Sequence, residues 1–429
     1  MSEPQRLVIV DGVRTPFCKM GSAFAALGAD ELGFYATRAL LAKTDLDPSL
    51  IHEVIFGCVG QPADAANISR IIALRAGIPH HVPAITVHRN CASGCEAVTQ
   101  AYEKMCAGRG EVFLVGGTES MSQYPLIYPY KTAVKLGQLA KAKSLGQKLG
   151  TLLSFRPADF KPRIGLLLGL TDPFCAMNMG QTAELIGRES LVTRDMQDEY
   201  ALKSHQKAVA AQQRLAEEIE PVFVPPRFTK PVESDIGPRA EQSIEALRKL
   251  RPVFEKVSGT VTAGNASQVT DGAVALLVMS ERKAAELGYE PLGTLTGYSY
   301  AACDPARMGL GPVYAIHQAQ QQTGLTLDDA DLIEINEAFA AQVLACIDKA
   351  RSDEFGRREL DRDGALGEIP EEKLNVNGGA IALGHPVGAT GARLVLTMLK
   401  ELKRRNSKRG LVSLCVGGGQ GAALWLERN

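Results

Sequence analysis

The sequence has almost no net charge, which removes several classes of protein from consideration. Its 47 lysines and arginines nearly balance 48 aspartates and glutamates, and the formal net charge at pH 7 is -1. No global field therefore draws the chain to nucleic acid or to a membrane, and an anionic ligand must be held by a local basic patch. We expect no nucleic-acid partner.

Long apolar runs and metal-ligand motifs are also missing. No uninterrupted apolar stretch is long enough to span a bilayer. The nine cysteines include no CxxC pair and have no histidine partner at metal-ligand spacing. This pattern argues against a disulfide framework and against a metal site, and it suits a reducing compartment.

A targeting segment is absent as well. The first residues, MSEPQRLVIVDGVRTPF, lack the basic stretch and the apolar core of a secretory signal. A strand-like run starts at Arg6–Val10, which leaves no room for a transit peptide. These absences predict a cytoplasmic protein.

The pattern that is present predicts an α/β fold of two or three domains. The chain has 429 residues, which exceeds one ordinary compact core. Short buried runs of Val, Ile and Leu alternate with helical stretches such as Glu31–Ala42, Cys95–Cys106 and Thr390–Lys403. Such alternation is typical of sheets covered by helices.

Two parts of the chain carry similar segments in the same order. In the first, PSLIHEVIFGCVG precedes HRNCASGCEAVTQAYEKM and EVFLVGGTES. In the second, DDADLIEINEAFA precedes NGGAIALGHPVGATGARLVLTML and GLVSLCVGGGQGAALWL. Each reads strand, loop with a reactive residue, helix and strand, which predicts a duplication, although any α/β protein shares part of this pattern.

The region between the repeats, Met121–Thr270, is richer in Pro, Lys and Arg and predicts an inserted lid or binding domain. The expected division is a first half at 1–121 completed by about 271–290, an insert at 122–270, and a second half at 291–429.

Four short segments carry groups that suit catalysis: NCASGC at Asn90–Cys95, NEAFA at Asn336–Ala340, GHP at Gly384–Pro386 and CVGGGQG at Cys415–Gly421. Each alone is weak, because a lone buried cysteine is more often a small hydrophobe and a lone histidine is usually structural. The glycine run precedes a strand rather than a helix, which argues against a dinucleotide-binding loop. Together and in this order, the four segments are strong evidence for one catalytic site.

Over essentially its whole length, from IVDGVRTPF at Ile9–Phe17 to the final glycine motif, the sequence resembles the thiolase family. The resemblance implies two related halves with mixed five-stranded sheets, layered αβαβα. It also implies an acetyl-CoA C-acyltransferase that cleaves 3-ketoacyl-CoA to acetyl-CoA and a shortened acyl-CoA, through an acyl-cysteine, in fatty-acid β-oxidation. CoA would be a substrate, and no cofactor or metal is expected.

The resemblance also assigns catalytic roles. Cys91 matches the nucleophile, His385 the base that activates it, and Cys415 the acid and base on C2 of acetyl-CoA. Asn336 matches the residue that orients a water in one oxyanion hole, and the N–H groups of Gly417 and Cys91 would form the other.

General chemistry supports these roles. Cys91 precedes a helical pattern, and a helix N-terminus lowers a thiol pKa; a nearby imidazole would complete its activation. Carbon–carbon cleavage forms an alkoxide and an enolate, which two oxyanion holes would stabilise. A base with a pKa near 8 suits enolate formation, which makes a second cysteine suitable at position 415.

The segment Thr260–Ala273 resembles the thiolase segment in which a serine, here Ser267, contacts the pantetheine arm of CoA. Asn178 stands where many thiolases have a histidine, which puts that contact and the acyl-chain preference in question. The other expected CoA-binding residues are Ala263, Gly264, Met179, Ala338 and Phe339.

Residues 131–163 are basic and interleaved with leucine, and GLLLGL follows at Gly165–Leu170. This segment resembles the β subunit of the trifunctional fatty-acid oxidation complex and its bacterial counterpart. It implies contact with an enoyl-CoA hydratase/3-hydroxyacyl-CoA dehydrogenase subunit or peripherally with a membrane. The alternative is a basic helix that covers the active-site entrance and meets the CoA phosphates. A homodimer or homotetramer is expected in either case.

Three other functions are alternatives to this one. An acetyl-CoA C-acetyltransferase would use the same residues to form acetoacetyl-CoA, and sequence does not set the direction. A decarboxylating ketoacyl synthase would have a second histidine in place of NEAF. A catalytically silent lipid-transfer or scaffold relative would have lost one of the four segments.

Overall fold

The computed structural model describes residues 6–428, so the outermost ends of the expected first and last domains, residues 1–5 and 429, lie outside the described chain. The first half contains β1 (Leu7–Arg14), β2 (Cys18–Lys19), α1 (Ala29–Thr44), β3 (Glu53–Gly57), α2 (Ile68–Arg75), β4 (Ala84–Val87), α3 (Ser93–Cys106), β5 (Val112–Glu119), β10 (Thr270–Ser280) and α11 (Glu281–Glu286). The second half contains β11 (Gly293–Ala302), α12 (Gly311–Thr323), β12 (Leu332–Ile335), α13 (Ala340–Ala350), α14 (Asp353–Glu359), α15 (Ala380–Leu383), α16 (Val387–Arg405), β13 (Arg409–Val416) and β14 (Gln420–Glu427).

Strand pairing repeats between the two halves. In the first, β4, β3 and β5 are parallel, and β10 and then β1 continue the sheet antiparallel. In the second, β12 and β13 are parallel, and β14 and β11 continue antiparallel. A parallel bridge between Ile333 and Leu374 takes the place of β4 beside β12. The predicted duplication and mixed sheets are therefore confirmed.

The two sheets are joined edge to edge, which the sequence pattern did not predict. β1 pairs with β11 through Leu7–Ile9, so one hydrogen-bonded path runs from β12 to β4 through both halves. Strand β10, at the end of the insert, pairs with both β1 and β5. β10 therefore continues the first sheet, while the division of the chain into domains stays a prediction.

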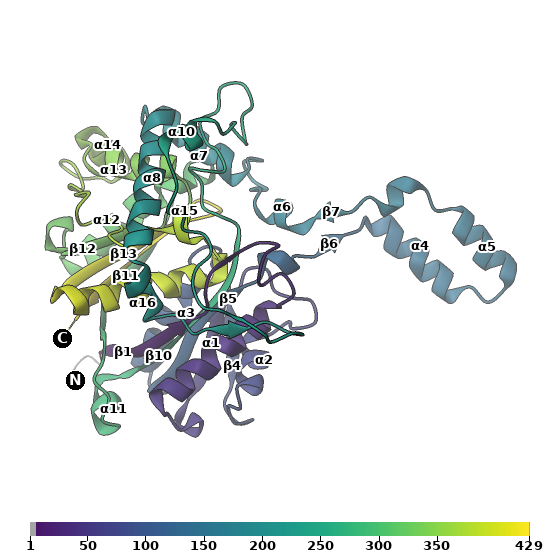
Figure 1. Ribbon diagram of the computed structural model, residues 1–429, viewed down its shortest axis with the longest axis horizontal. Helices are drawn as coiled ribbons and strands as arrows, with labels where there is room; N and C mark the ends of the chain where they lie inside the picture. Colours follow the sequence, from purple (N-terminus) through teal and green to yellow (C-terminus); the bar gives the residue numbers. More distant parts are fainter. Residues whose placement is uncertain (1–5, 429) are drawn as a thin grey trace.

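Helices α3 and α16 form the central layer between the sheets (Figure 1). Their contact depends on Gly94 and Gly391, because a Cβ on either residue would lie 2.4–2.5 Å from a backbone nitrogen of the other helix. Helices α1 and α2 share an apolar core with the first sheet, and α12 and α13 share one with the second. These five layers confirm the predicted αβαβα arrangement.

The insert divides into a projecting arm and a part that returns to the body. Its elements are β6 (Leu126–Ile127), α4 (Tyr130–Lys141), α5 (Leu145–Leu153), β7 (Arg163–Ile164), α6 (Gly165–Gly169), α7 (Met179–Glu189), α8 (Arg194–Ala210), α9 (Gln212–Ala216), β8 (Val222–Phe223), β9 (Pro231–Val232) and α10 (Ile244–Arg248). The paired strands β6 and β7 carry α4 and α5 far from the rest of the molecule (Figure 1). Across residues 6–428, no helix combines the length and the apolar character that a membrane span needs.

Candidate active site

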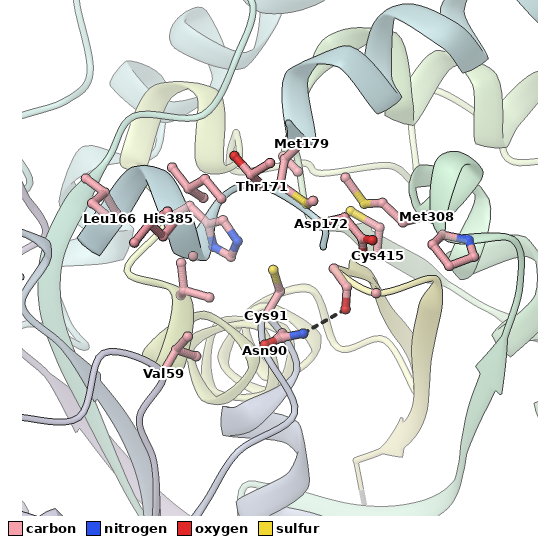
Figure 2. A pocket seen from close by; sticks show the side chains of 18 of the residues that line it. Val59, Asn90, Cys91, Leu166, Thr171, Asp172, Met179, Met308, His385 and Cys415 are labelled. Atoms are coloured by element: carbon pink, nitrogen blue, oxygen red, sulfur yellow. Dashed lines mark hydrogen bonds between the residues drawn. The ribbon is translucent and has the colours of Figure 1, made fainter. Parts of the chain in front are cut away.

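A cavity of about 800 Å³ lies where both halves meet α6 and the start of α7. Cys91, His385 and Cys415 reach it from three separate elements, and Figure 2 shows all three side chains directed into the same space. Most of the other lining side chains are apolar. A mostly apolar cavity of this size with a few polar groups is typical of a small-molecule site.

Cys91 and His385 occupy equivalent positions in the duplicated fold. α3 begins at Ser93 and α16 begins at Val387, so each reactive residue lies two positions before the first helical residue. Because α3 and α16 pack together in the central layer, the duplication itself brings the two side chains to one cavity.

The loop of Cys91 is tied to the glycine loop after Cys415. Asn90 adopts the left-handed region with a φ of 43°, which asparagine tolerates better than most residues. Its Nδ2 donates to the carbonyl oxygen of Gly417 at 2.7 Å (Figure 2), and Ser93 Oγ donates to the Asn90 carbonyl at 2.6 Å. Asn90 was missed from the sequence, although its place directly before Cys91 could have indicated it.

Burial raises the pKa of the Cys91 thiol to about 11. The backbone N–H groups of Gly417 and of Cys91 itself act on the sulfur in the opposite direction, but more weakly. The expected lowering of this pKa by the helix N-terminus is therefore wrong for the free protein, because removal of the sulfur from water outweighs those groups. This direction favours the thiol form of Cys91 at neutral pH.

His385 lines the same cavity as Cys91. Burial, with a further contribution from the Arg393 cation, lowers its pKa to about 4, so the imidazole is neutral at physiological pH. Nδ1 lies 2.6 Å from Thr390 Oγ1, and Nε2 makes no hydrogen bond to any residue between 6 and 428. The backbone just before His385 passes close to Thr270, and only a glycine fits there. Gly384 has a φ of 104°, and a Cβ on it would lie 2.2 Å from Thr270 Oγ1.

Cys415 lies near the end of β13 and is fully buried. Burial, with Cys91 nearby, raises the pKa of its thiol well above the ordinary value. The expected base with a pKa near 8 is therefore wrong for the free protein. Its role as acid and base on C2 stays a prediction.

Asn336 follows β12 and is buried, but its side chain does not line the cavity. Neither Oδ1 nor Nδ2 of Asn336 bonds to any residue in the described range 6–428. Buried amide atoms need hydrogen-bonding partners, and a water would satisfy them. Its role in an oxyanion hole stays a prediction.

The expected CoA-binding residues fall into two groups. Met179, Ser267, Ala338 and Phe339 line the cavity, and the Ser267 N–H donates to the Ala338 carbonyl at 2.9 Å. A ring from the insert, Phe254, packs edge-on against Phe339 and was missed from the sequence.

The other three lie outside the cavity lining. Asn178 caps α7, since its Oδ1 accepts from Gly180 N at 3.0 Å. Gly264 packs against Leu247 and Leu250, and Ala263 faces solvent. The turn folds around the buried Asn265, whose Oδ1 accepts from Thr262 N at 2.8 Å, and Ala263 is the exposed residue of this turn.

A second apolar wall was not predicted as a group. It is formed by Val59, Met121, Tyr124, Leu166, Leu170 and Val387. Leu166 and Leu170 belong to the GLLLGL segment, so only the final part of the basic insert reaches the cavity, while α4 and α5 stand away from it (Figure 1). Within this chain, the basic helices α4 and α5 therefore do not lie over the cavity.

Glu119, at the end of β5, links the two halves below the cavity. Its carboxylate accepts from the N–H groups of Val59, Gly60 and Gly388 at 2.8–3.1 Å. Burial raises the pKa of this carboxyl to about 7, although those three bonds act to lower it. Through these bonds, Glu119 holds the start of α16, which follows His385, next to the loop of the first half that contains Val59 and Gly60.

The duplicated five-layer fold, with reactive side chains at the paired starts of its central helices, defines the class of thiolase-fold enzymes. The family model for the thiolase N-terminal domain matches residues 7–282, and that for the thiolase C-terminal domain matches residues 289–428. The chain belongs to the thiolase family, and it is an acyltransferase.

Known relatives agree with this membership. A 3-ketoacyl-CoA thiolase of Pectobacterium atrosepticum is 42% identical over 98% of this chain and 96% of its own. The Bacillus anthracis acetyl-CoA acetyltransferase superposes with a TM-score of 0.85 at 38% identity, covering 99% of both chains. Human mitochondrial 3-ketoacyl-CoA thiolase in complex with CoA superposes with a TM-score of 0.84 at 36% identity, covering 99% of this chain and 98% of its own.

Proposed function

We propose that the protein cleaves 3-ketoacyl-CoA with CoA, giving acetyl-CoA and an acyl-CoA two carbons shorter, in fatty-acid β-oxidation. The observation that carries the proposal is the meeting of Cys91, His385 and Cys415 in one mostly apolar cavity. The name printed for the bacterial relative, 3-ketoacyl-CoA thiolase, supports the same substrate.

In the first half-reaction, His385 Nε2 takes the proton of Cys91, and the sulfur attacks the 3-keto carbon. The N–H groups of Cys91 and Gly417 act on this sulfur, so they suit the alkoxide that forms on the attacked carbon. The bond between C2 and C3 then breaks. Acyl-Cys91 remains, and the enolate of acetyl-CoA leaves.

Cys415 completes proton transfer to the leaving group. As a thiol, it gives its proton to C2 of the enolate and releases acetyl-CoA, while Asn336 and His385 would stabilise the enolate oxygen. The Cys415 thiolate then takes the proton of an incoming CoA thiol. That CoA attacks acyl-Cys91, and the Cys91 thiolate recovers its proton from His385, which closes the cycle.

A CoA-dependent cleavage assay over a series of 3-ketoacyl-CoA chain lengths tests the proposal. Incubation with substrate should leave an acyl adduct on Cys91, and Cys91→Ser should abolish turnover. Cys415→Ala should stop exchange of C2 protons on acetyl-CoA but permit some acylation, whereas His385→Ala should impair acylation. An adduct on Cys95 or Cys415 would overturn the assignment.

Acetoacetyl-CoA synthesis is the second candidate, favoured by the likeness to the Bacillus anthracis acetyltransferase. It predicts activity confined to the shortest member of the chain-length series. The apolar wall beside Cys91 that includes Leu166 and Tyr124 offers surface for a longer acyl chain, which favours the first candidate.

We also propose that the arm formed by α4 and α5 contacts a hydratase–dehydrogenase subunit or an anionic membrane. Tyr130, Leu145 and Leu153 on this arm are more than three-quarters exposed. Lys131 and Lys135 bind Asp159 within the arm, and its other bases face solvent. A homodimer or homotetramer in the cytoplasm remains the expected state of the protein.

A further inference from the structure

The ring of His385 has one neighbour that can decide which of its nitrogens carries the proton. Nδ1 lies 2.6 Å from Thr390 Oγ1, and both residues are buried at the start of α16. Thr390 Oγ1 also lies 3.0 Å from the carbonyl oxygen of Pro386, to which it donates. The hydroxyl has a single proton, so it cannot donate to both neighbours at once.

The two possible arrangements make different numbers of hydrogen bonds. If Thr390 donates to Pro386, Nδ1–H donates to Thr390, both bonds form, and Nε2 is left as a bare lone pair. If Thr390 donates to Nδ1, the bond to Pro386 is lost and the proton lies on Nε2. Within residues 6–428, no acceptor bonds to that nitrogen. The first arrangement makes two hydrogen bonds and the second makes one, which favours the first arrangement.

The main chain of His385 is held by hydrogen bonds as well. Its N–H donates to the Gln268 carbonyl at 3.1 Å and approaches Thr270 Oγ1 at 3.2 Å. The Thr270 hydroxyl in turn donates to the Gln268 carbonyl at 2.7 Å. The ring is thereby presented to the cavity by its Nε2 edge.

We propose that Thr390 is a positioning residue that holds His385 in the tautomer with the proton on Nδ1, so that Nε2 is the base that receives the Cys91 proton. When Cys91 loses its proton to Nε2, the imidazolium keeps its Nδ1–H on Thr390 Oγ1, and that bond gains strength from the charge. Thr390 acts through His385 and touches no substrate atom. The proposal rests on the proposed role of His385.

The protonation state can be measured in the unmodified enzyme. Nitrogen NMR of protein labelled with [15N]histidine distinguishes protonated from bare ring nitrogens, and the signals of His385 among the seven histidines are identified by their loss in His385→Gln. At neutral pH we expect a protonated Nδ1 and a bare Nε2. A proton on Nε2 in the wild-type enzyme overturns the proposal. This readout does not depend on activity, so a failure of the proposed function is recognised separately, by the absence of thiolysis.

Two variants test the consequence for the reaction. Thr390→Val keeps the branched shape but removes the acceptor, whereas Thr390→Ser keeps the hydroxyl. We expect Thr390→Val to move the proton to Nε2 and to slow acylation of Cys91 by about 100-fold, with the KM for CoA nearly unchanged, since loss of a general base costs this much or more. Thr390→Ser should restore both the tautomer and the rate to within about threefold of wild type. Equal losses in the two variants, or an unchanged tautomer in Thr390→Val, would contradict the assignment.

Discussion

Asn90 Nδ2 donates to the Gly417 carbonyl oxygen at 2.7 Å, and this single bond joins the loop that carries Cys91 to the loop that follows Cys415. The two loops come from different halves of the duplicated fold. The bond therefore sets how the N–H groups of Cys91 and Gly417 are placed around the sulfur.

Asn90→Gly should lower kcat by roughly tenfold. Glycine adopts the positive φ of Asn90 without strain, so the substitution removes the bond and little else. The lost bond itself contributes only about 1 kcal/mol net to stability. The larger effect is on the transition state, because a misplaced oxyanion-hole donor stabilises the alkoxide less well. Steady-state thiolysis measures the loss, with the thermal midpoint as a control for folding. Wild-type kcat in Asn90→Gly would show that the two loops are held together by other contacts.

Alkylation of Cys91 should rise with pH well into the alkaline range. Because burial raises the pKa of this thiol to about 11, the reactive thiolate fraction grows about tenfold per pH unit from pH 7 to pH 10. The rate constant for iodoacetamide, followed by mass spectrometry of the Cys91 peptide, measures this dependence. Exposed Cys106 serves as an internal control for the reagent. A plateau near pH 7 would indicate a preformed thiolate instead.

The features that could be predicted from the sequence are those encoded by residues close together along the chain. The hydrophobic period and the repeated order of segments gave the duplicated α/β fold, and Cys91, His385 and Cys415 each stand in a motif whose residues are adjacent along the chain. The pKa of Cys91 could not be predicted in this way. It depends on burial, and therefore on Leu166 and other side chains brought over the cysteine from distant segments.

The expected CoA-binding residues stay predictions, and the structure brings only four of the seven to the cavity: Met179, Ser267, Ala338 and Phe339. Nearness in sequence does not place residues on one surface, because the turn around Asn265 leaves Ala263 exposed while Ser267 lines the cavity. Likewise, the composition of the arm indicated bases and leucines, but not that β6 and β7 carry it away from the cavity.

Glu119 should make the protein less stable as pH rises through neutrality. Its carboxyl pKa is about 7 in the folded chain, against 4.5 for an ordinary glutamate. Between these values the folded chain holds a proton that the unfolded chain releases, so the free energy of unfolding falls with rising pH, by roughly 3 kcal/mol in full. Glu119→Gln lacks this titration. Urea unfolding at pH 5 and pH 8 measures the free energy of unfolding of both proteins. That of the wild type, relative to that of the variant, should be lower at pH 8 than at pH 5. A difference between the two proteins that stays constant with pH would contradict the raised pKa.

The last prediction concerns Lys141, Lys143 and Lys148, which are exposed on the arm beyond the bases that bind Asp159. Each basic residue near an anionic surface contributes about 1 kcal/mol of attraction, and the neighbouring exposed leucines add apolar contact. Changing all three to Glu should weaken binding to anionic vesicles or to a co-expressed hydratase–dehydrogenase subunit by at least 100-fold. Cleavage of short-chain substrates should be largely retained, since α4 and α5 stand away from the cavity.

The matched control changes Lys19, Lys230 and Lys408 to Glu. These residues are exposed on the body of the molecule, and their replacement alters the net charge by the same amount. Vesicle co-sedimentation and native mass with and without the partner subunit provide the two readouts. Equal weakening in both triple variants would attribute the attraction to overall charge. Unchanged association of the arm variant with a raised KM for CoA would instead make the arm a surface that steers the substrate, and the docking role would be rejected.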